Sequence, residues 1–460
     1  MYIFLFMSQF EIRVGDCKDL YNTLEDESIA VCVNSPPYHA CRDYDCNESI
    51  FDGYKECLHE WIKDLPQIQK EKLIPADFEA EELEKFKTYH FCKLCGAWFG
   101  KLGHEPDWDC RMININGNKL HVHGYISHLA DCYDGLKKKL KKDGSLFVVI
   151  GDKFSSKAAG SGGKGIKSPK VHIKGKENFQ TFKPIKLQYK EPEGTQLCIP
   201  FHFIFEMQKR GWIVKQVLPW FKSNAFTGST KMKFNPDYEI VIWFVLDADK
   251  YKFNTQWEPK KCPHAKSKNA TNKHEGYGSA LYSGYSYDAE DNPNRIKRAT
   301  IDLKDDPEAM YYNFYEVAEE IGFEHAMELL DKRFQDTIIQ NTEQCDLPHF
   351  ATYPRELIRP FILGCSDKGD LVLDNFCGVG STGVVCIEEE RNFIGFDISQ
   401  KYKQMADQRI QEAVEWKPII DAWKEEVKRC ESLGIKPPKE PKKPTKKRIK
   451  KENDNVNEDC

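Results

Sequence analysis

The sequence predicts an α/β fold built on a largely parallel sheet with helices on both faces. Apolar runs typical of strands alternate with helical patterns over residues 10–33 and again over 354–411. A glycine-rich turn follows the apolar run Leu371–Asp374 and opens a helical pattern, as in nucleotide-binding β-α-β units. Hydrophobic residues make up 40% of the 460 residues, which is enough for a sizeable core.

Each expected element follows from a local pattern. In chain order we expect strand 10–14, a short helix ending at Leu24, strand 29–33, helix 125–141, strand 145–150, helix 198–210, strands 212–220 and 238–246, a helix from 354, strand 371–374, a helix, strand 393–397 and a last helix. Apolar residues recur at helical spacing in 125–141, and Lys142-Asp143-Gly144 is expected to end that helix.

Four segments differ in composition from these elements. Residues 48–120 look like an insertion rich in charge, cysteine and histidine. Residues 153–190 hold ten lysines and one acid, which predicts a mobile cationic loop. Residues 225–345 are polar and irregular, and residues 416–460 are expected to be a basic, disordered tail. These segments interrupt or extend one α/β domain.

Overall charge and cysteine content narrow the class of protein. The net charge of -5 gives no global sign of nucleic-acid binding, so any such surface must be local. The apolar start, Met1–Phe6, is too short for a signal peptide or a membrane span. We therefore expect a cytoplasmic protein with no membrane partner. Since thiols stay reduced in that compartment, paired members of the 17 cysteines suggest metal ligands before disulfides.

The glycine-rich turn suggests a nucleoside cofactor. Gly378 and Gly380 would let the backbone approach a ligand, and Asp397 ends the next strand, where a carboxylate can grip a ribose diol. The spacing to Gly383 leaves a dinucleotide open. Asp374, at the strand end before the turn, suits a sulfonium or ammonium group better than a pyrophosphate. An ordinary strand-to-helix turn is the alternative.

The stretch Ser35-Pro36-Pro37-Tyr38 ends the apolar strand at 29–33. Two prolines fix the backbone, so this stretch by itself reads as a rigid turn. Its residue types also suit an amine substrate: the Ser35 hydroxyl and the Pro36 carbonyl could accept two N–H bonds, and Tyr38 could stack on a flat ring. The second interpretation gains weight only from the rest of the chain.

Together these segments resemble DNA amino-methyltransferases that use S-adenosylmethionine. "DNFCGVGST" (374–382) resembles the family's cofactor loop, "NFIGFDIS" (392–399) its ribose-binding segment and "SPPY" its catalytic motif. The catalytic motif precedes the cofactor loop, as in the circularly permuted β-type group. The resemblance covers about 10–50, 90–245 and 345–411. It implies a Rossmann-like, seven-stranded methyltransferase sheet, circularly permuted, with a zinc-binding insertion and a target-recognition region.

The resemblance also assigns roles to residues. It implies catalytic residues Ser35, Pro36, Pro37 and Tyr38, and cofactor-binding residues Asp16, Pro354, Asp374, Phe376, Gly378, Gly380, Thr382 and Asp397. A methyl group would pass directly from sulfonium to the exocyclic amine of a base flipped out of double-stranded DNA. In the family, serine at the first motif position usually accompanies cytosine N4 methylation, whereas aspartate or asparagine usually accompanies adenine N6.

Two alternatives to a cytosine-N4 enzyme stay open. One is an adenine-N6 methyltransferase with the same fold and chemistry. The other is a catalytically silent DNA-binding protein that keeps the fold, although the intact Ser35–Tyr38 motif argues against it. A cognate restriction endonuclease is a further candidate partner that the resemblance suggests.

The insertion carries a candidate structural zinc site. Cys92 and Cys95 have zinc-knuckle spacing, and Cys57 and His59 offer a second pair of ligands. Some members of the resembled family carry a similar pairing. His90, His104 and Cys110 are competing ligands, and reduced cysteines without a metal are the alternative.

The sequence predicts six consecutive segments. The ranges are 8–47, the catalytic-motif part of the methyltransferase domain; 48–120, the zinc-binding insertion; 121–224, the same domain continued with its lysine-rich loop; 225–345, target recognition; 346–415, the cofactor-binding part; and 416–460, the tail. The loop and the tail are candidates for phosphate contacts.

Overall fold

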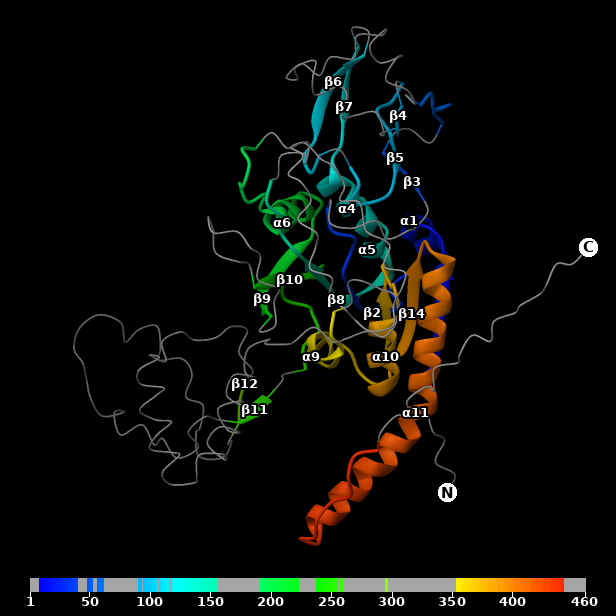
Figure 1. Cartoon of the computed structure of the whole chain (residues 1–460), viewed down its shortest axis with the longest axis vertical. Coiled ribbons are helices and arrows are strands. Elements are labelled where there is room, and N and C mark those ends of the chain that lie inside the picture. Colours follow the sequence, from blue (N-terminus) through cyan, green and yellow to red (C-terminus); the bar gives the residue numbers. More distant parts are fainter. Residues whose placement is uncertain are drawn as a thin grey trace, which may run out of the picture.

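A seven-stranded sheet organises the computed structural model (Figure 1). Its order is β1-β14-β13-β2-β8-β10-β9, with bounds β1 Phe10–Val14, β14 Asn392–Asp397, β13 Leu371–Asp374, β2 Ile29–Asn34, β8 Leu140–Ile150, β10 Tyr238–Val245 and β9 Ile213–Phe221. The first five strands pair in parallel, and β10 is antiparallel to both of its neighbours. The predicted Rossmann-like, seven-stranded sheet is confirmed.

The structure describes twelve stretches of the chain. They are residues 8–39, 48–52, 56–61, 90–92, 94–105, 107–115, 118–155, 191–222, 237–254, 257–259, 294–296 and 353–441. Most of the predicted lysine-rich loop, most of the predicted target-recognition region and residues 442–460 of the predicted tail lie outside them. No helix in these stretches is both long enough and apolar enough to cross a membrane.

Helices cover both faces of the sheet, as predicted. Their bounds are α1 Cys17–Leu20, α4 Tyr125–Asp134, α5 Leu136–Lys139, α6 Ile199–Lys209, α9 Arg355–Cys365, α10 Ser381–Glu388 and α11 Gln400–Ser432, with a 3-10 turn η1 at Tyr21–Thr23. Alternate residues of β8 join two separate cores: Val148 packs with α1, α4 and α6, whereas Val149 packs with α9, α10 and α11. This two-sided burial explains the apolar character of the central strands.

The single helix predicted over 125–141 is interrupted at Gly135 and already ends at Lys139. The α4 helix ends at Asp134, and Leu140 already pairs with Ile29 as the first residue of β8. A Cβ atom at Gly135 would lie 2.5 Å from the Tyr21 ring, so glycine is required where the chain crosses this side chain. Pairing with β2 therefore outweighs the helical spacing of the apolar residues.

The boundary predicted for the tail is also wrong. Residues 416–432 continue α11, which projects from the body of the protein in Figure 1. Ion pairs at helical spacing, such as Lys417–Asp421 and Glu426–Arg429, stabilise this exposed half. Beyond the helix, the Trp423 indole donates a hydrogen bond to the Pro438 carbonyl, so the following residues fold back along it. Charged composition thus indicated a solvated helix rather than disorder.

The insertion forms small sheets beside the N-terminal end of α4 (Figure 1). Strands β3 Ser49–Phe51, β5 Trp98–Gly100 and β4 His90–Phe91 make one sheet, and β6 Arg111–Ile115 pairs with β7 Asn118–Val122. A separate two-stranded antiparallel sheet pairs β11 Trp257–Pro259 with β12 Asn294–Ile296. The described parts of the insertion are therefore folded, and Phe51 and Trp98 in them belong to the same hydrophobic core as α4.

Candidate functional site

Strands β2 and β13 bring the two motifs to one edge of the sheet. They are parallel neighbours, with Cys32 opposite Leu373. Ser35 and Phe376 each lie three residues further along, so both motifs leave the sheet at the same level. A hydrogen bond of 3.5 Å from the Cys32 thiol to the Asn375 side chain ties the strand ends together. The sheet thus brings together two motifs that are more than three hundred residues apart in the sequence.

The glycine-rich turn is held by the predicted acidic residue. Gly378 and Gly380 have φ values of 51° and 76°, which side chains other than glycine rarely adopt. The Asp397 carboxylate accepts hydrogen bonds from the Gly378 and Ser399 N–H groups, each at 2.8 Å. Burial raises the pKa of Asp397 to about 7 despite these bonds. Since each carboxylate oxygen has a second lone pair, Asp397 can still accept from the hydroxyls of a ligand.

Asp374 is more deeply engaged than the sequence suggested. Its carboxylate is 1% exposed and accepts from the Phe376 N–H at 3.0 Å, from the Tyr353 hydroxyl at 2.9 Å and from the Thr382 hydroxyl at 2.6 Å. Burial raises its pKa to about 6. These contacts shape the loop from inside, so in this structure Asp374 and Thr382 organise the turn.

The remaining predicted cofactor residues surround this loop. Asp16 caps α1 by accepting from the Lys18 N–H at 2.9 Å, next to Gly15, whose N–H donates to the Asp397 carbonyl. Pro354 is the buried residue that precedes α9. Phe376 is partly buried, with its ring centroid 6.2 Å from that of Tyr133. The fold therefore places these residues at strand and helix ends on one side of the sheet.

The Ser35–Tyr38 motif is fixed by contacts from the insertion and α4. The Tyr125 hydroxyl donates to the Pro37 carbonyl at 2.8 Å. Gly103, with φ of 89°, lies so close that a Cβ atom there would sit 2.9 Å from the Tyr38 carbonyl oxygen. Neither contact uses the Pro36 carbonyl. The motif is thus a rigid turn, as its prolines imply.

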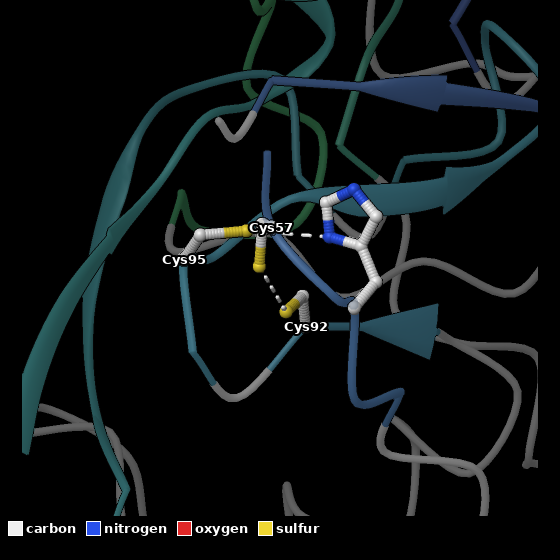
Figure 2. Close-up of side chains that lie close together, drawn as sticks. Cys57, Cys92 and Cys95 are labelled. Atoms are coloured by element: carbon white, nitrogen blue, oxygen red, sulfur yellow. Dashed lines mark hydrogen bonds between the residues drawn. The ribbon is translucent and has the colours of Figure 1, made fainter. Parts of the chain in front are cut away.

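The four predicted metal ligands come together. One ligand atom from each of Cys57, His59, Cys92 and Cys95 lies within 4.8 Å of all the others. Figure 2 shows the three labelled cysteines facing a common centre, with the Cys57 and Cys92 sulfurs 3.9 Å apart. The Cys95 sulfur is 3.5 Å from His59 Nδ1. The competing ligand Cys110 is not part of this cluster.

This geometry fits a tetrahedral zinc ion. Zinc–sulfur bonds of about 2.3 Å imply sulfur–sulfur edges of about 3.8 Å. The Cys57–Cys92 separation is close to that edge. Burial opposes ionisation of Cys92, but hydrogen bonds from His59 and from backbone N–H groups lower its pKa to about 6. Burial and the neighbouring thiols raise the pKa of Cys57 to about 12, so Cys92 ionises before Cys57. Four protein ligands would leave no open position, which is typical of a structural site.

A buried ionic network joins the insertion to α4. His128 is fully buried and contacts Asp52 through Nε2 at 2.6 Å and Glu105 through Nδ1 at 3.2 Å. Its ring stacks against both Phe51 and Trp98, which also contact each other. Burial would lower the pKa of His128, but the two carboxylates raise it to about 9. Two acids can each accept from the same imidazole only when both of its nitrogens carry protons.

This network predicts a loss of stability at alkaline pH. The pKa of His128 is raised above its ordinary value of about 6.5, so its contribution is complete below that pH and disappears as pH rises through about 9. The shift corresponds to roughly 3 kcal/mol. We expect the thermal midpoint to fall between pH 7 and 9.5, measured at constant ionic strength. In His128→Asn this fall of the thermal midpoint should be absent. If the midpoints of wild type and His128→Asn fall in parallel with rising pH, His128 is not the group responsible.

Three residues contact the site although the sequence did not predict them as site residues. Tyr353 bonds to Asp374, Tyr125 holds Pro37, and Glu239 accepts a hydrogen bond of 2.9 Å from the Tyr38 hydroxyl. One sequence signal was available for Glu239, because it is the single acid in the apolar strand Tyr238–Val245. Tyr353 and Tyr125 carry no such signal, since tyrosines at the starts of amphipathic helices usually serve the core.

Strand order and the glycine-rich loop define a Rossmann-like α/β protein of the methyltransferase type. A model of the DNA methylase family N6_N4_Mtase matches residues 104–408, more than half of the 460 residues. The chain therefore belongs to this DNA methylase family, and the resemblance drawn from its motifs is confirmed. The match contains the glycine-rich loop but begins after Ser35–Tyr38, so the catalytic role of that motif stays a prediction.

The chain is also similar to individual methyltransferases. Type II methyltransferase M.Cfr9I of Citrobacter freundii is 25% identical over 313 residues, covering 66% of this chain and 79% of the relative. Type II methyltransferase M.SmaI of Serratia marcescens is 25% identical over 370 residues, covering 79% and 97%. The solved PvuII DNA methyltransferase (cytosine-N4-specific) aligns over 89% of this chain and 93% of its own, with 14% identity and a TM-score of 0.41.

Proposed function

We propose that this chain transfers a methyl group from S-adenosylmethionine to the N4 amine of a cytosine flipped out of double-stranded DNA. The observation that carries the proposal is the parallel register of β2 and β13, because it sets Ser35 level with the glycine-rich loop. A donor bound at that loop and an amine resting on Ser35 would then meet at one edge of the sheet.

The cofactor assignment rests on the acids around the loop. Asp397, already tied to Gly378, would accept the ribose hydroxyls, and the ordered Asp374 would contribute negative charge near the sulfonium or the amino group. The remaining cofactor contacts would come from the loop and from the ends of neighbouring elements. They are proposed for Asp16, Pro354, Phe376, Gly378, Gly380 and Thr382.

The motif would activate a poor nucleophile. The lone pair of an exocyclic amine is delocalised into the base, so the nitrogen must become tetrahedral before it can attack. Acceptors at the Ser35 oxygen and the Pro36 carbonyl favour that geometry by binding the two N–H bonds, and the rigid prolines keep them in place without reorganisation. The methyl group then passes directly to nitrogen, with no covalent bond between enzyme and base.

Identification of the modified base tests the proposal and separates it from adenine methylation. Unmethylated DNA is incubated with the protein and S-adenosylmethionine, digested to nucleosides and analysed by mass spectrometry. We expect N4-methyldeoxycytidine, since serine stands first in the motif. N6-methyldeoxyadenosine would overturn the choice of base but not the reaction. No methylated nucleoside from several DNAs of varied sequence would favour the silent DNA-binding alternative.

Other parts of the chain receive auxiliary roles in this proposal. Zinc bound by Cys57, His59, Cys92 and Cys95 would stabilise the insertion, and residues 225–345 would read the target sequence. The lysine-rich loop at 153–190 and the basic part of 416–460 would neutralise phosphates. The type II class of the two relatives supports action within the cytoplasm of a cell that carries a cognate restriction endonuclease.

A further inference from the structure

We propose that Glu239 receives the proton released by the target amine, through a relay formed by Ser35 and Tyr38. The inference rests on the proposed function, because it concerns the same amine. Methylation of an exocyclic amine places a positive charge on nitrogen, and one N–H proton must leave before a neutral product forms. The three side chains lie in sequence, with Ser35 Oγ 3.3 Å from Tyr38 Oη and Tyr38 Oη 2.9 Å from Glu239 Oε2.

The antiparallel strand β10 explains how Glu239 reaches this edge. Every parallel strand ends at the site, whereas β10 runs the other way and begins there. Ile240 pairs with Ile150, so Glu239 lies opposite Gly151, at the end of β8. A Cβ atom at Gly151 would lie 2.8 Å from the Tyr38 ring and 3.6 Å from the Glu239 carboxyl carbon. Glycine therefore makes the space in which Tyr38 and Glu239 meet.

Hydrogen-bond chemistry sets the direction of the relay. Lys222, the residue after β9, forms an ion pair with the Glu239 carboxylate. An ionised carboxylate only accepts, so the Tyr38 hydroxyl must donate to it. Because the hydrogen of Tyr38 is then used, its contact with Ser35 requires Ser35 to donate. The Ser35 oxygen keeps lone pairs for an amine N–H, so each donor points from the substrate toward Glu239.

The proposed step balances in atoms and charge. The amine lone pair forms the N–C bond to the methyl carbon, and the C–S bonding pair stays on sulfur, which becomes a neutral thioether. As that bond forms, an N–H proton passes to Ser35 Oγ, the Ser35 proton passes to Tyr38 Oη, and the Tyr38 proton passes to Glu239. The carboxylate becomes a carboxylic acid and afterwards releases its proton to solvent, to which its side chain is 20% exposed.

Single-turnover methyl transfer to DNA tests the relay, because product release does not limit it. We expect Glu239→Gln and Tyr38→Phe each to slow transfer roughly 100-fold, the scale of general-base catalysis. Both should leave binding of S-adenosylmethionine within about twofold, and the double variant should be no slower than the single ones, since they cut one pathway. Glu426→Gln, which removes a carboxylate from an exposed ion pair on α11, is the matched control and should behave as wild type.

Two further readouts separate proton transfer from a purely positional role. The wild-type rate should show a solvent deuterium isotope effect that Glu239→Gln lacks. Formate, a small carboxylate, should restore part of the rate of Glu239→Ala but not that of Tyr38→Phe. The relay is overturned if wild-type protein methylates DNA and Glu239→Gln does so at the same rate. It is also overturned if the double variant is slowed by the product of the two single effects and formate restores no activity to Glu239→Ala. Absence of methylation by wild-type protein would instead overturn the proposed function.

Discussion

Ser35→Ala is expected to slow methyl transfer by roughly 100-fold to 1000-fold, the usual effect of removing one preorganised hydrogen-bond partner at a reacting atom. The substitution deletes the acceptor for one amine N–H and also breaks the contact with Tyr38. Ser35 is only partly buried at the end of β2, so its loss should leave the fold intact. Single-turnover rates and direct binding of S-adenosylmethionine should therefore diverge, with affinity for the cofactor nearly unchanged.

Asp397→Ala provides the complementary control. It removes the carboxylate that holds the Gly378 and Ser399 N–H groups and that is assigned to the ribose. We expect cofactor affinity to fall at least tenfold, with transfer at saturating cofactor affected less. If Ser35→Ala and Asp397→Ala weaken cofactor binding equally, the division between an amine pocket and a cofactor loop is wrong.

Removal of zinc is expected to unfold the insertion. Structural zinc sites in small domains contribute about 10–16 kcal/mol of apparent binding free energy, and the small sheets of this insertion have little core of their own. Purified protein should contain one zinc ion per chain by elemental analysis. A strong chelator, or Cys92→Ser, should make the insertion sensitive to proteolysis while the seven-stranded domain stays resistant.

Cys110→Ser is the matched control for the zinc site. Cys110 lies in the same insertion but outside the four-residue cluster, so this variant should keep its zinc and its resistance to protease. Zinc lost from Cys110→Ser would move the ligand set to other residues. Purified wild-type protein without zinc would show that the four-residue cluster is not a zinc site.

Local sequence patterns were sufficient to predict most strands. The apolar runs at 29–33, 371–374 and 393–397 appear as β2, β13 and β14 with small changes at their ends. Strands buried on both faces leave such a strong signal because every position is apolar. The Cys57–His59 and Cys92–Cys95 pairs could likewise be matched from chelating chemistry alone.

Other features depended on partners that are distant in the sequence. Leu140 satisfies a helical pattern, yet pairing with Ile29 makes it part of a strand. Residues 416–432 look like a polar tail, yet they continue α11, where Lys417 pairs with the distant Glu390 as well as with Asp421 one turn along the helix. In both cases the local pattern was real, but hydrogen bonds or charges from other positions decided which structure it formed.

The sequence by itself determined the α/β class, the glycine-rich loop with its acid at the next strand end, and the Ser35-Pro36-Pro37-Tyr38 turn, because each depends on neighbouring residues. Only the tertiary structure decided what surrounds the turn. Glu239 meets Tyr38 because one strand of the sheet runs opposite to the others, and Tyr353 meets Asp374 because α9 packs beside the cofactor loop. Such contacts depend on the direction and order of strands, which local residue patterns do not encode.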